Sequence, residues 1–186
     1  MATRKQTSAK AAPQKVERKP KGITMEEAVR AYQNDPIINS RIAENTLTDG
    51  QRLVVEALDS GMKPLKDMAL SRVTVPDTID FYLREAKVAR IEELKDKTIT
   101  HIPFLSVTKN DMKSLVERRI NLGLSKTVGI IVYANDKLKG VDVNEVLGVS
   151  NGFAQQREVI LARGQKFQVR KVTYENACPI LHLYAV

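Results

Sequence analysis

The sequence predicts an α+β fold, with helices in the N-terminal third of the chain and mostly strands after it. Two observations carry this prediction: helix start and stop signals are concentrated in the first 70 residues, and short apolar runs with strand character begin only at Ile79. The length of 186 residues allows one domain, or one domain with a tail, and the 42% hydrophobic content is enough for an ordinary core.

Four helices are expected in the N-terminal third. Thr24-Met25-Glu26-Glu27 is a capping box, in which a hydroxyl and a carboxylate satisfy the first free amides of a helix. Asp35-Pro36 breaks the first helix, and Ser60-Gly61 ends the third. The predicted helices cover residues 25–33, 37–44, 48–58 and 64–70.

Runs with strand character follow, and two helical segments interrupt them. The strands are predicted at residues 79–84, 98–107, 127–133, 156–161, 166–172 and 180–186. The interrupting helices are predicted at residues 87–95 and 111–122. Helices followed mainly by strands are typical of an α+β domain.

The basic charge of the chain is concentrated at its N-terminus. The formal charge of +8 comes from 30 basic and 22 acidic residues. Residues 1–22 contain seven basic residues against Glu17 alone, which leaves 23 basic and 21 acidic residues in the remainder. We therefore expect a disordered basic tail over residues 1–22 and a folded domain over residues 23–186 that is not itself a nucleic-acid module. The tail is either a solubilising segment or an electrostatic tether for nucleic acid or another acidic partner.

Several functional classes find no support in the sequence. No run approaches the roughly 20 apolar residues of a membrane span, and the N-terminus lacks a secretory signal, so we expect a soluble protein made in the cytoplasm. Cys178 is the only cysteine, which argues against a disulfide or a multi-cysteine metal site. His101 and His182 lie in apolar runs without a nucleophile motif, and we expect both to be structural. No metal is expected.

A polar pair directly before an apolar strand is the most informative feature, within residues 153–169. Gln156 and Glu158 are two residues apart, so on a strand their side chains share a face about 6.5–7 Å apart. Ile160 continues that face. A carboxylate beside an amide could act on one ligand, although an exposed strand start has the same pattern.

The residues after this pair predict a hairpin. Arg163-Gly164 is a turn signal, and Lys166 to Val169 alternates again between polar and apolar side chains. The first strand of the predicted hairpin opens with Gln156 and Glu158.

Two further short motifs precede the polar pair in the chain. They are Phe81-Tyr82-Leu83-Arg84 and Phe104-Leu105-Ser106-Val107-Thr108. Together with Gln156-Arg157-Glu158, they resemble the motifs of mono-ADP-ribosyltransferases in type, order and spacing. The resemblance covers roughly residues 48–186. It implies a helical part followed by two packed, mainly antiparallel sheets with a cleft for NAD between them.

The resemblance implies a role for each matching residue. Glu158 matches the catalytic glutamate, which stabilises positive charge on the ribose when the bond to nicotinamide breaks. Arg84 matches the arginine that holds the NAD phosphates, a task that suits the rigid fork of a guanidinium. Ser106 matches the serine that braces the glutamate, and Thr108 would support the site from the same face. From the residues alone, Glu158 also fits an exposed strand and Arg84 a surface salt bridge.

One departure from the family pattern concerns the nicotinamide. Members usually carry an aromatic residue shortly after the serine motif, but residues 109–122 contain no Phe, Tyr or Trp. Met112 or Leu115 would be the nearest substitutes.

Gln156 and Phe153 indicate the class of acceptor that the resemblance implies. Family members that modify arginine usually have Glu at the first motif position. Gln156 instead resembles enzymes that modify asparagine on Rho-type GTPases or guanine in DNA, since an amide can form paired hydrogen bonds with an amide-like edge. Phe153 resembles the aromatic of the acceptor-recognition turn in Rho-modifying exoenzymes. We expect transfer of ADP-ribose to a protein side chain other than arginine.

Two alternatives stay open beside this expectation. A transferase acting on guanine could reach nucleic acid through the basic tail, and a non-catalytic interaction module could use the same fold. The resemblance also implies a toxin or effector of bacterial or phage origin, which would act in the cytoplasm of a host cell.

Overall fold

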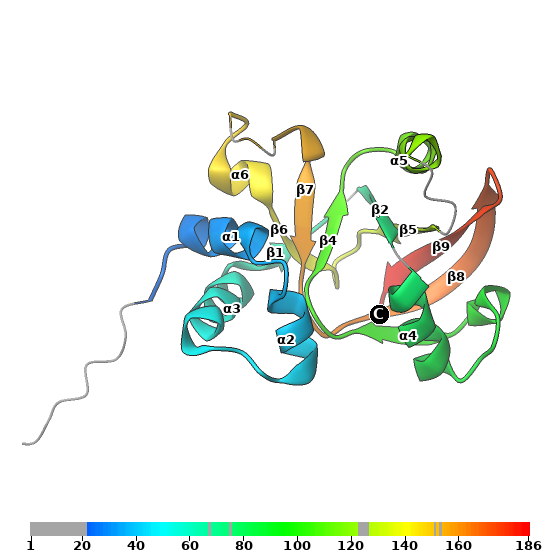
Figure 1. Ribbon diagram of the computed structural model, residues 1–186, viewed down its shortest axis with the longest axis horizontal. Helices are drawn as coiled ribbons and strands as arrows, with labels where there is room; N and C mark the ends of the chain where they lie inside the picture. Colours follow the sequence, from blue (N-terminus) through cyan, green and yellow to red (C-terminus); the bar gives the residue numbers. More distant parts are fainter. Residues whose placement is uncertain (1–21, 67, 75, 123–126, 151, 153) are drawn as a thin grey trace, which may run out of the picture.

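The N-terminal helices lie beside the strands of the molecule. Figure 1 shows the computed structural model, with helices α1 to α3 together on one side and most strands beside them. The structure describes residues 22–66, 68–74, 76–122, 127–150, 152 and 154–186. Of the predicted tail, only Gly22 falls within these ranges.

Three helices form the N-terminal part of the fold, and the first and third begin at capping boxes. They are α1 (Met25–Asn34), α2 (Ile38–Glu44) and α3 (Asp49–Gly61). Thr24 forms a reciprocal capping box with Glu27, and Thr48 forms one with Gln51. The prediction of these three helices is confirmed.

Two predicted elements have the opposite secondary structure. The predicted helix at residues 64–70 is replaced by the end of β1 (Lys63–Pro64) and the start of β2 (Ala69–Thr74). The predicted strand at residues 79–84 belongs to helix α4 (Pro76–Ala86). Both predictions were wrong. Strand β2 lies inside the sheet and shows no clean alternation, whereas α4 buries Ile79 and Tyr82 at helical spacing.

The remaining elements complete the α+β arrangement. The other helical elements are η1 (Ile91–Leu94), α5 (Met112–Asn121), α6 (Val143–Leu147) and η2 (Ala154–Gln156). The other strands are β3 (Thr98–His101), β4 (Leu105–Thr108), β5 (Val128–Tyr133), β6 (Lys139–Asp142), β7 (Glu158–Leu161), β8 (Gln165–Glu175) and β9 (Cys178–Ala185).

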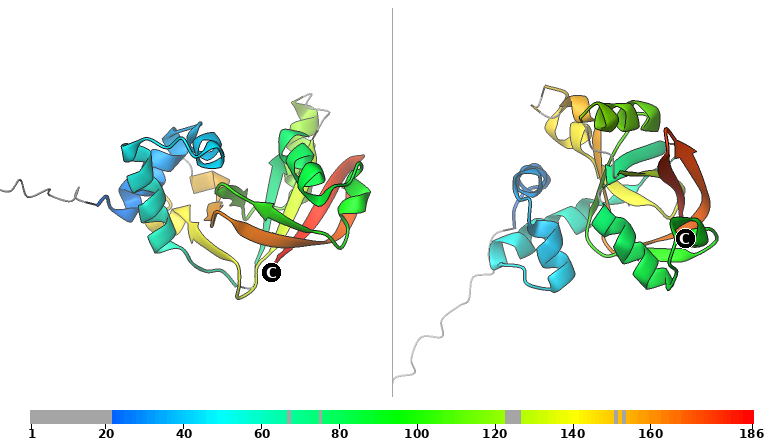
Figure 2. Two further views of the ribbon diagram at one scale, coloured as in Figure 1. Left: turned by 90° about the horizontal axis from the view of Figure 1, so that it is seen from below. Right: turned by 45° about the vertical axis from the view of Figure 1, so that its right-hand side comes forward.

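The described strands form one sheet, which corrects the expectation of two. Its nine strands follow the order β1-β6-β7-β4-β2-β5-β9-β8-β3. Strands β5 and β9 are parallel, and the other neighbours are antiparallel. The two halves of the sheet meet where β2 pairs with β4 through Ser71 and Thr108 alone. Figures 1 and 2 show that the strands on either side of this join run in different directions. The two groups of strands are thus joined by hydrogen bonds at a narrow connection.

The predicted hairpin after Glu158 is also wrong. Gly164 has a positive φ of 67°, as expected for the turn. However, β7 pairs with β4 and β6, whereas β8 pairs with β3 and β9. The turn therefore leads the chain from one half of the sheet to the other.

Strand β7 and the segment that leads into β4 contribute side chains to two separate cores. Ile160 of β7 and Phe104, directly before β4, pack with helices α1 to α3. Val159 and Leu105 belong to the core that also contains Tyr82 of α4. Because side chains alternate along a strand, Glu158 lies on the same face as Ile160, toward the N-terminal helices. None of the described helices has the length and apolar character needed to cross a membrane.

Candidate active site

Glu158 is half-buried at the start of β7, and both of its carboxylate oxygens accept a hydrogen bond. Ser106 Oγ donates to Oε1 at 2.6 Å, and Gln33 Nε2 donates to Oε2 at 2.8 Å. Glu158 forms no ion pair with any described Lys or Arg. Two neutral donors thus fix the carboxylate without placing a positive charge on it.

Ser106 and Thr108 of β4 support Glu158 and the segment before it. Thr108 lies opposite Glu158 in the β4–β7 register. Its hydroxyl donates to the backbone oxygen of Gln156 and accepts a hydrogen bond from the Asn110 amide at 3.1 Å. The structure therefore brings the two predicted β4 residues together with Glu158.

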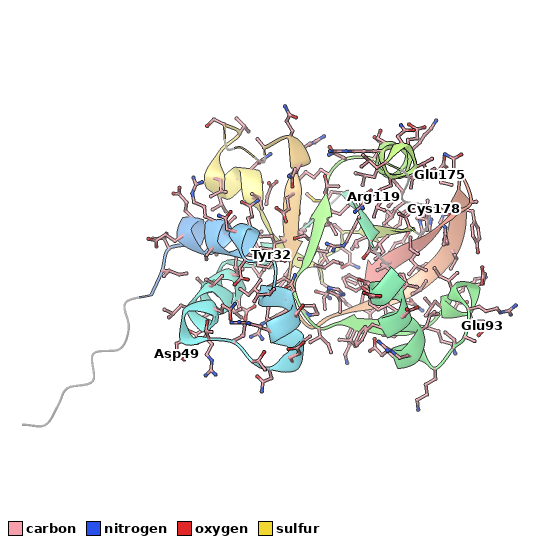
Figure 3. All side chains as sticks on the ribbon, in the orientation of Figure 1. Tyr32, Asp49, Glu93, Arg119, Glu175 and Cys178 are labelled. Atoms are coloured by element: carbon pink, nitrogen blue, oxygen red, sulfur yellow. The ribbon has the colours of Figure 1, made fainter. Side chains whose placement is uncertain are left out.

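A chain of hydrogen bonds connects helix α2 to the carboxylate. Asn39 Nδ2 donates to the Tyr32 hydroxyl at 2.9 Å, and this hydroxyl lies 3.3 Å from Ser106 Oγ. Since the single proton of the Ser106 hydroxyl goes to Glu158, Tyr32 must donate to Ser106. Burial raises the pKa of Tyr32, so its hydroxyl keeps the proton that this bond needs. Figure 3 shows Tyr32 at the end of α1, beside β4 and β7.

Gln156 occupies a different backbone setting from the predicted one. It is the last residue of η2, and β7 begins two residues later. Arg157 between them has a positive φ of 47°, so Gln156 and Glu158 are not consecutive same-face residues of one strand. Both side chains still line the two pockets that border Glu158, one of about 460 Å³ and one of about 240 Å³. Phe153 lies outside the described residues.

The structure does not bring Arg84 to the site. Arg84 is exposed in the last turn of α4 and is absent from the described lining of both pockets at Glu158. Arg72 of β2 lies there instead, and its Nη1 donates to the backbone oxygen of Ser106 at 2.5 Å. Arg72 was not predicted, because residues 64–70 were expected to form a helix and no strand was expected at residues 69–74. The sequence signal that could have identified Arg72 is the run Leu70 to Thr74, which has this arginine at its centre.

A cleft of about 460 Å³ opens beside Glu158. Its lining includes Arg72 together with Arg118 and Arg119 of α5. Figure 3 shows Arg119 between α5 and β2. Guanidinium groups suit phosphate because their donors form a rigid fork, so three of them in one cleft favour a phosphate-bearing ligand. The two arginines of α5 were not singled out from the sequence, because a helical charge run usually marks a solvated face.

The two substitutes proposed for the missing aromatic residue differ in position. Leu115 lines the large cleft. Met112 is buried in a small core with Val116 and Ile180. Of the two, Leu115 is the one placed to contact a ligand in the cleft.

A second pocket of about 240 Å³ also borders Glu158. It shares Ser106, Gln156 and Glu158 with the large cleft, and the rest of its lining comes from residues 32–39. Its described lining contains Asp35 and no Lys or Arg. The two pockets therefore meet at Glu158 with opposite electrostatic character.

The two histidines point to no other chemistry in the described part of the chain. Burial lowers the pKa of His101 to about 4, and burial lowers that of His182 to about 4. Their Nδ1 atoms lie 2.8 Å from the Tyr82 hydroxyl and 2.9 Å from the Tyr133 hydroxyl, respectively. Within the described ranges, no group of three or more His, Cys, Asp or Glu side chains is placed to hold a metal ion.

Comparison with known proteins identifies the fold. No protein-family model and no curated protein matches the sequence. The C3 exoenzyme of Clostridium limosum shares 16% identity, with a TM-score of 0.65 over 87% of this chain and 84% of that one. C3stau2 of S. aureus, solved with NAD, shares 13% identity, with a TM-score of 0.61 over 87% of this chain and 86% of that one.

A longer toxin component gives a similar match. The ADP-ribosylating toxin BECa of a C. perfringens binary enterotoxin, solved with NADH, shares 14% identity, with a TM-score of 0.60 over 88% of this chain and 44% of that one. At these identities the matches establish the fold, which is that of bacterial ADP-ribosyltransferase toxins. The resemblance seen in the sequence is confirmed at this level.

Proposed function

We propose that this protein is a mono-ADP-ribosyltransferase that uses NAD as its substrate. One observation carries the proposal: on the fold of ADP-ribosyltransferase toxins, the Glu158 carboxylate is fixed by Ser106 at the edge of a cleft that contains Arg72. The guanidinium groups of this cleft would hold the NAD diphosphate. The carboxylate would stabilise positive charge at the ribose.

The proposed reaction replaces one bond to the ribose with another. The bond from the ribose C1′ to the nicotinamide nitrogen breaks, and its electron pair leaves with neutral nicotinamide. The acceptor atom then supplies an electron pair to C1′ and loses one proton to solvent or to a base. Water in place of the acceptor yields free ADP-ribose.

The two pockets would separate the two substrates. The large cleft, with three arginines, suits the negatively charged NAD. The smaller pocket has Asp35 and no basic residue in its described lining, which disfavours a phosphate-bearing acceptor. We therefore favour a neutral group on a protein over guanine in nucleic acid as the acceptor.

Expression in host cells followed by mass spectrometry tests this function. Extracted proteins and nucleic acids are searched for ADP-ribose adducts, and cells that express Glu158→Gln serve as the matched control. We expect adducts on protein side chains other than arginine, and only with the unmodified protein. Adducts confined to nucleic acid would reject the protein acceptor, and equal adducts in the control would reject the transferase.

Changes at Gln156 are expected to affect acceptor transfer more than NAD hydrolysis. Gln156 borders both pockets, so Gln156→Ala and Gln156→Glu alter the acceptor side as well as the edge of the NAD cleft. Transfer to the acceptor and hydrolysis by water are measured separately for each variant. Efficient modification of agmatine by the unmodified protein would contradict the exclusion of arginine.

Deletion of residues 1–22 is expected to leave the melting temperature and NAD hydrolysis unchanged. These residues contain almost no large apolar side chains that could add to a core. If their seven basic residues tether an acidic partner, acceptor transfer falls, and the loss becomes smaller at high salt. A lower melting temperature after truncation would show that the tail belongs to the folded domain.

A further inference from the structure

Helix α1 reaches the Glu158 carboxylate with two consecutive residues near its C-terminal end. Tyr32 acts on Oε1 through Ser106, and Gln33 donates directly to Oε2 at 2.8 Å. The preceding turns of the helix are anchored, because Ala28, Val29 and Tyr32 are buried in a core with Phe104. The ring of Tyr32 also meets that of Phe104 edge to face, with centroids 5.6 Å apart.

The chemical nature of Gln33 matters for a carboxylate that must stabilise a cation. A neutral amide orients the carboxylate and leaves its charge available to the ribose. A lysine or arginine in the same place would pair with that charge and weaken its effect on the reaction. Arg72, which also lines the cleft at Glu158, donates to the backbone oxygen of Ser106 and not to the carboxylate.

We propose that Gln33 is a positioning residue, which holds Oε2 of Glu158 from helix α1 in the geometry that the reaction needs. This role rests on the proposed function. It makes the N-terminal helices part of the active site, since they hold one carboxylate oxygen directly and the other through Ser106. Gln33 lines the smaller pocket and is absent from the described lining of the large cleft, so it acts through Glu158 rather than by contact with NAD in that cleft.

Three variants of the full chain test the role through the rate of nicotinamide release from NAD. Gln33→Leu removes the donor and should lower kcat by about ten- to hundredfold, with a smaller change in the KM for NAD. Gln33→Lys places a cation at the carboxylate and should lower kcat further than Gln33→Leu. The order would be the reverse if Gln33 only filled space, because a long flexible lysine can turn to solvent.

Gln33→Glu gives a pH signature that a structural role would not produce. Two adjacent carboxylates share one proton, and the upper apparent pKa of the pair is raised. Below that pKa, the introduced carboxyl is protonated and can donate to Glu158 as the amide does. Above it, the donor is lost and the two charges repel. Activity should therefore fall as pH rises through this pKa, whereas the unmodified protein and Gln33→Leu should lack this alkaline loss.

Titration of the Glu158 side-chain carboxyl by ¹³C NMR in the free protein separates this role from the proposed function. We expect coupled titration of two carboxyls in Gln33→Glu, with the unmodified protein measured in parallel as the control. If the unmodified protein releases nicotinamide but coupling is absent, or Gln33→Leu stays within about twofold of it in rate, the positioning role is rejected. If coupling is present but no nicotinamide is released, the contact stands and the proposed function fails.

Discussion

Replacement of Glu158 by glutamine is expected to lower nicotinamide release from NAD by about a hundredfold or more, because the transition state loses its nearest negative charge. Glutamine has nearly the same shape and can still accept from Ser106. The residue is half-buried at a strand start and forms no ion pair among the described residues. The free energy of unfolding should therefore change by only about 0.5–1 kcal/mol.

Release is measured by chromatography of nicotinamide, and folding is checked by thermal unfolding of the same samples. Glu158→Ala should be at least as inactive, since it also removes both hydrogen bonds to the carboxylate. Undiminished turnover in either variant would remove Glu158 from the proposed reaction. A collapse of the melting temperature in Glu158→Gln would instead indicate a structural role.

Arg72→Ala is expected to give the second large loss, about 10- to 100-fold in kcat/KM for NAD, because a charge-assisted hydrogen bond contributes about 1.5–3 kcal/mol. The side chain lines the large cleft and also bonds to the backbone oxygen of Ser106. The melting temperature should fall as well, because this bond supports the narrow connection between β2 and β4. Steady-state kinetics and thermal unfolding measure the two effects.

Arg84→Ala is the matched control for Arg72→Ala, since it removes the same charge from an exposed position on α4. Its kcat/KM should stay within about twofold of the unmodified protein. A large loss in Arg84→Ala together with normal activity in Arg72→Ala would reverse the assignment of the two arginines. Arg72→Lys should retain part of the activity, because it keeps the charge but loses the planar fork.

Ser106, Thr108 and Glu158 of the candidate site could be predicted from the sequence because they lie in short local patterns. Ser106 and Thr108 are two residues apart and so share one face of a strand, and Glu158 directly precedes an apolar run. These strands pair in register in the folded chain, and Ser106 and Glu158 meet by hydrogen bonding. The starts of α1 and α3 could likewise be predicted, because a capping box is a contact between residues three apart in the sequence.

The structure does not place Arg84 at the cleft as predicted, because two local sequence patterns were ambiguous. Phe81 to Arg84 contains apolar side chains in a short run, which fits a strand or a buried helix equally well. The segment is a helix, α4, because Ile79 and Tyr82 are buried together against the sheet, and this contact is not visible in the local sequence. Strand β2 was not predicted for a different reason, since the buried and exposed residues of this strand inside the sheet do not alternate regularly.

The contribution of the N-terminal helices could not be predicted locally. Gln33 and Glu158 are 125 residues apart in the chain, and Tyr32 and Ser106 are 74 apart. Nothing near Tyr32 in the sequence distinguishes it from any aromatic residue on the buried face of a helix. The single sheet also could not be predicted from local sequence, because β2 and β4 are joined only by the residue pair Ser71 and Thr108.

The most direct measurement of the central claim is nicotinamide release by the unmodified protein. NAD that carries a label in its nicotinamide ring is incubated with the purified full chain, with Glu158→Gln in parallel. We predict steady release of labelled nicotinamide with an equal amount of ADP-ribose, and about a hundredfold less from the variant. Intact NAD after prolonged incubation, or equal release by the two proteins, would contradict the proposal.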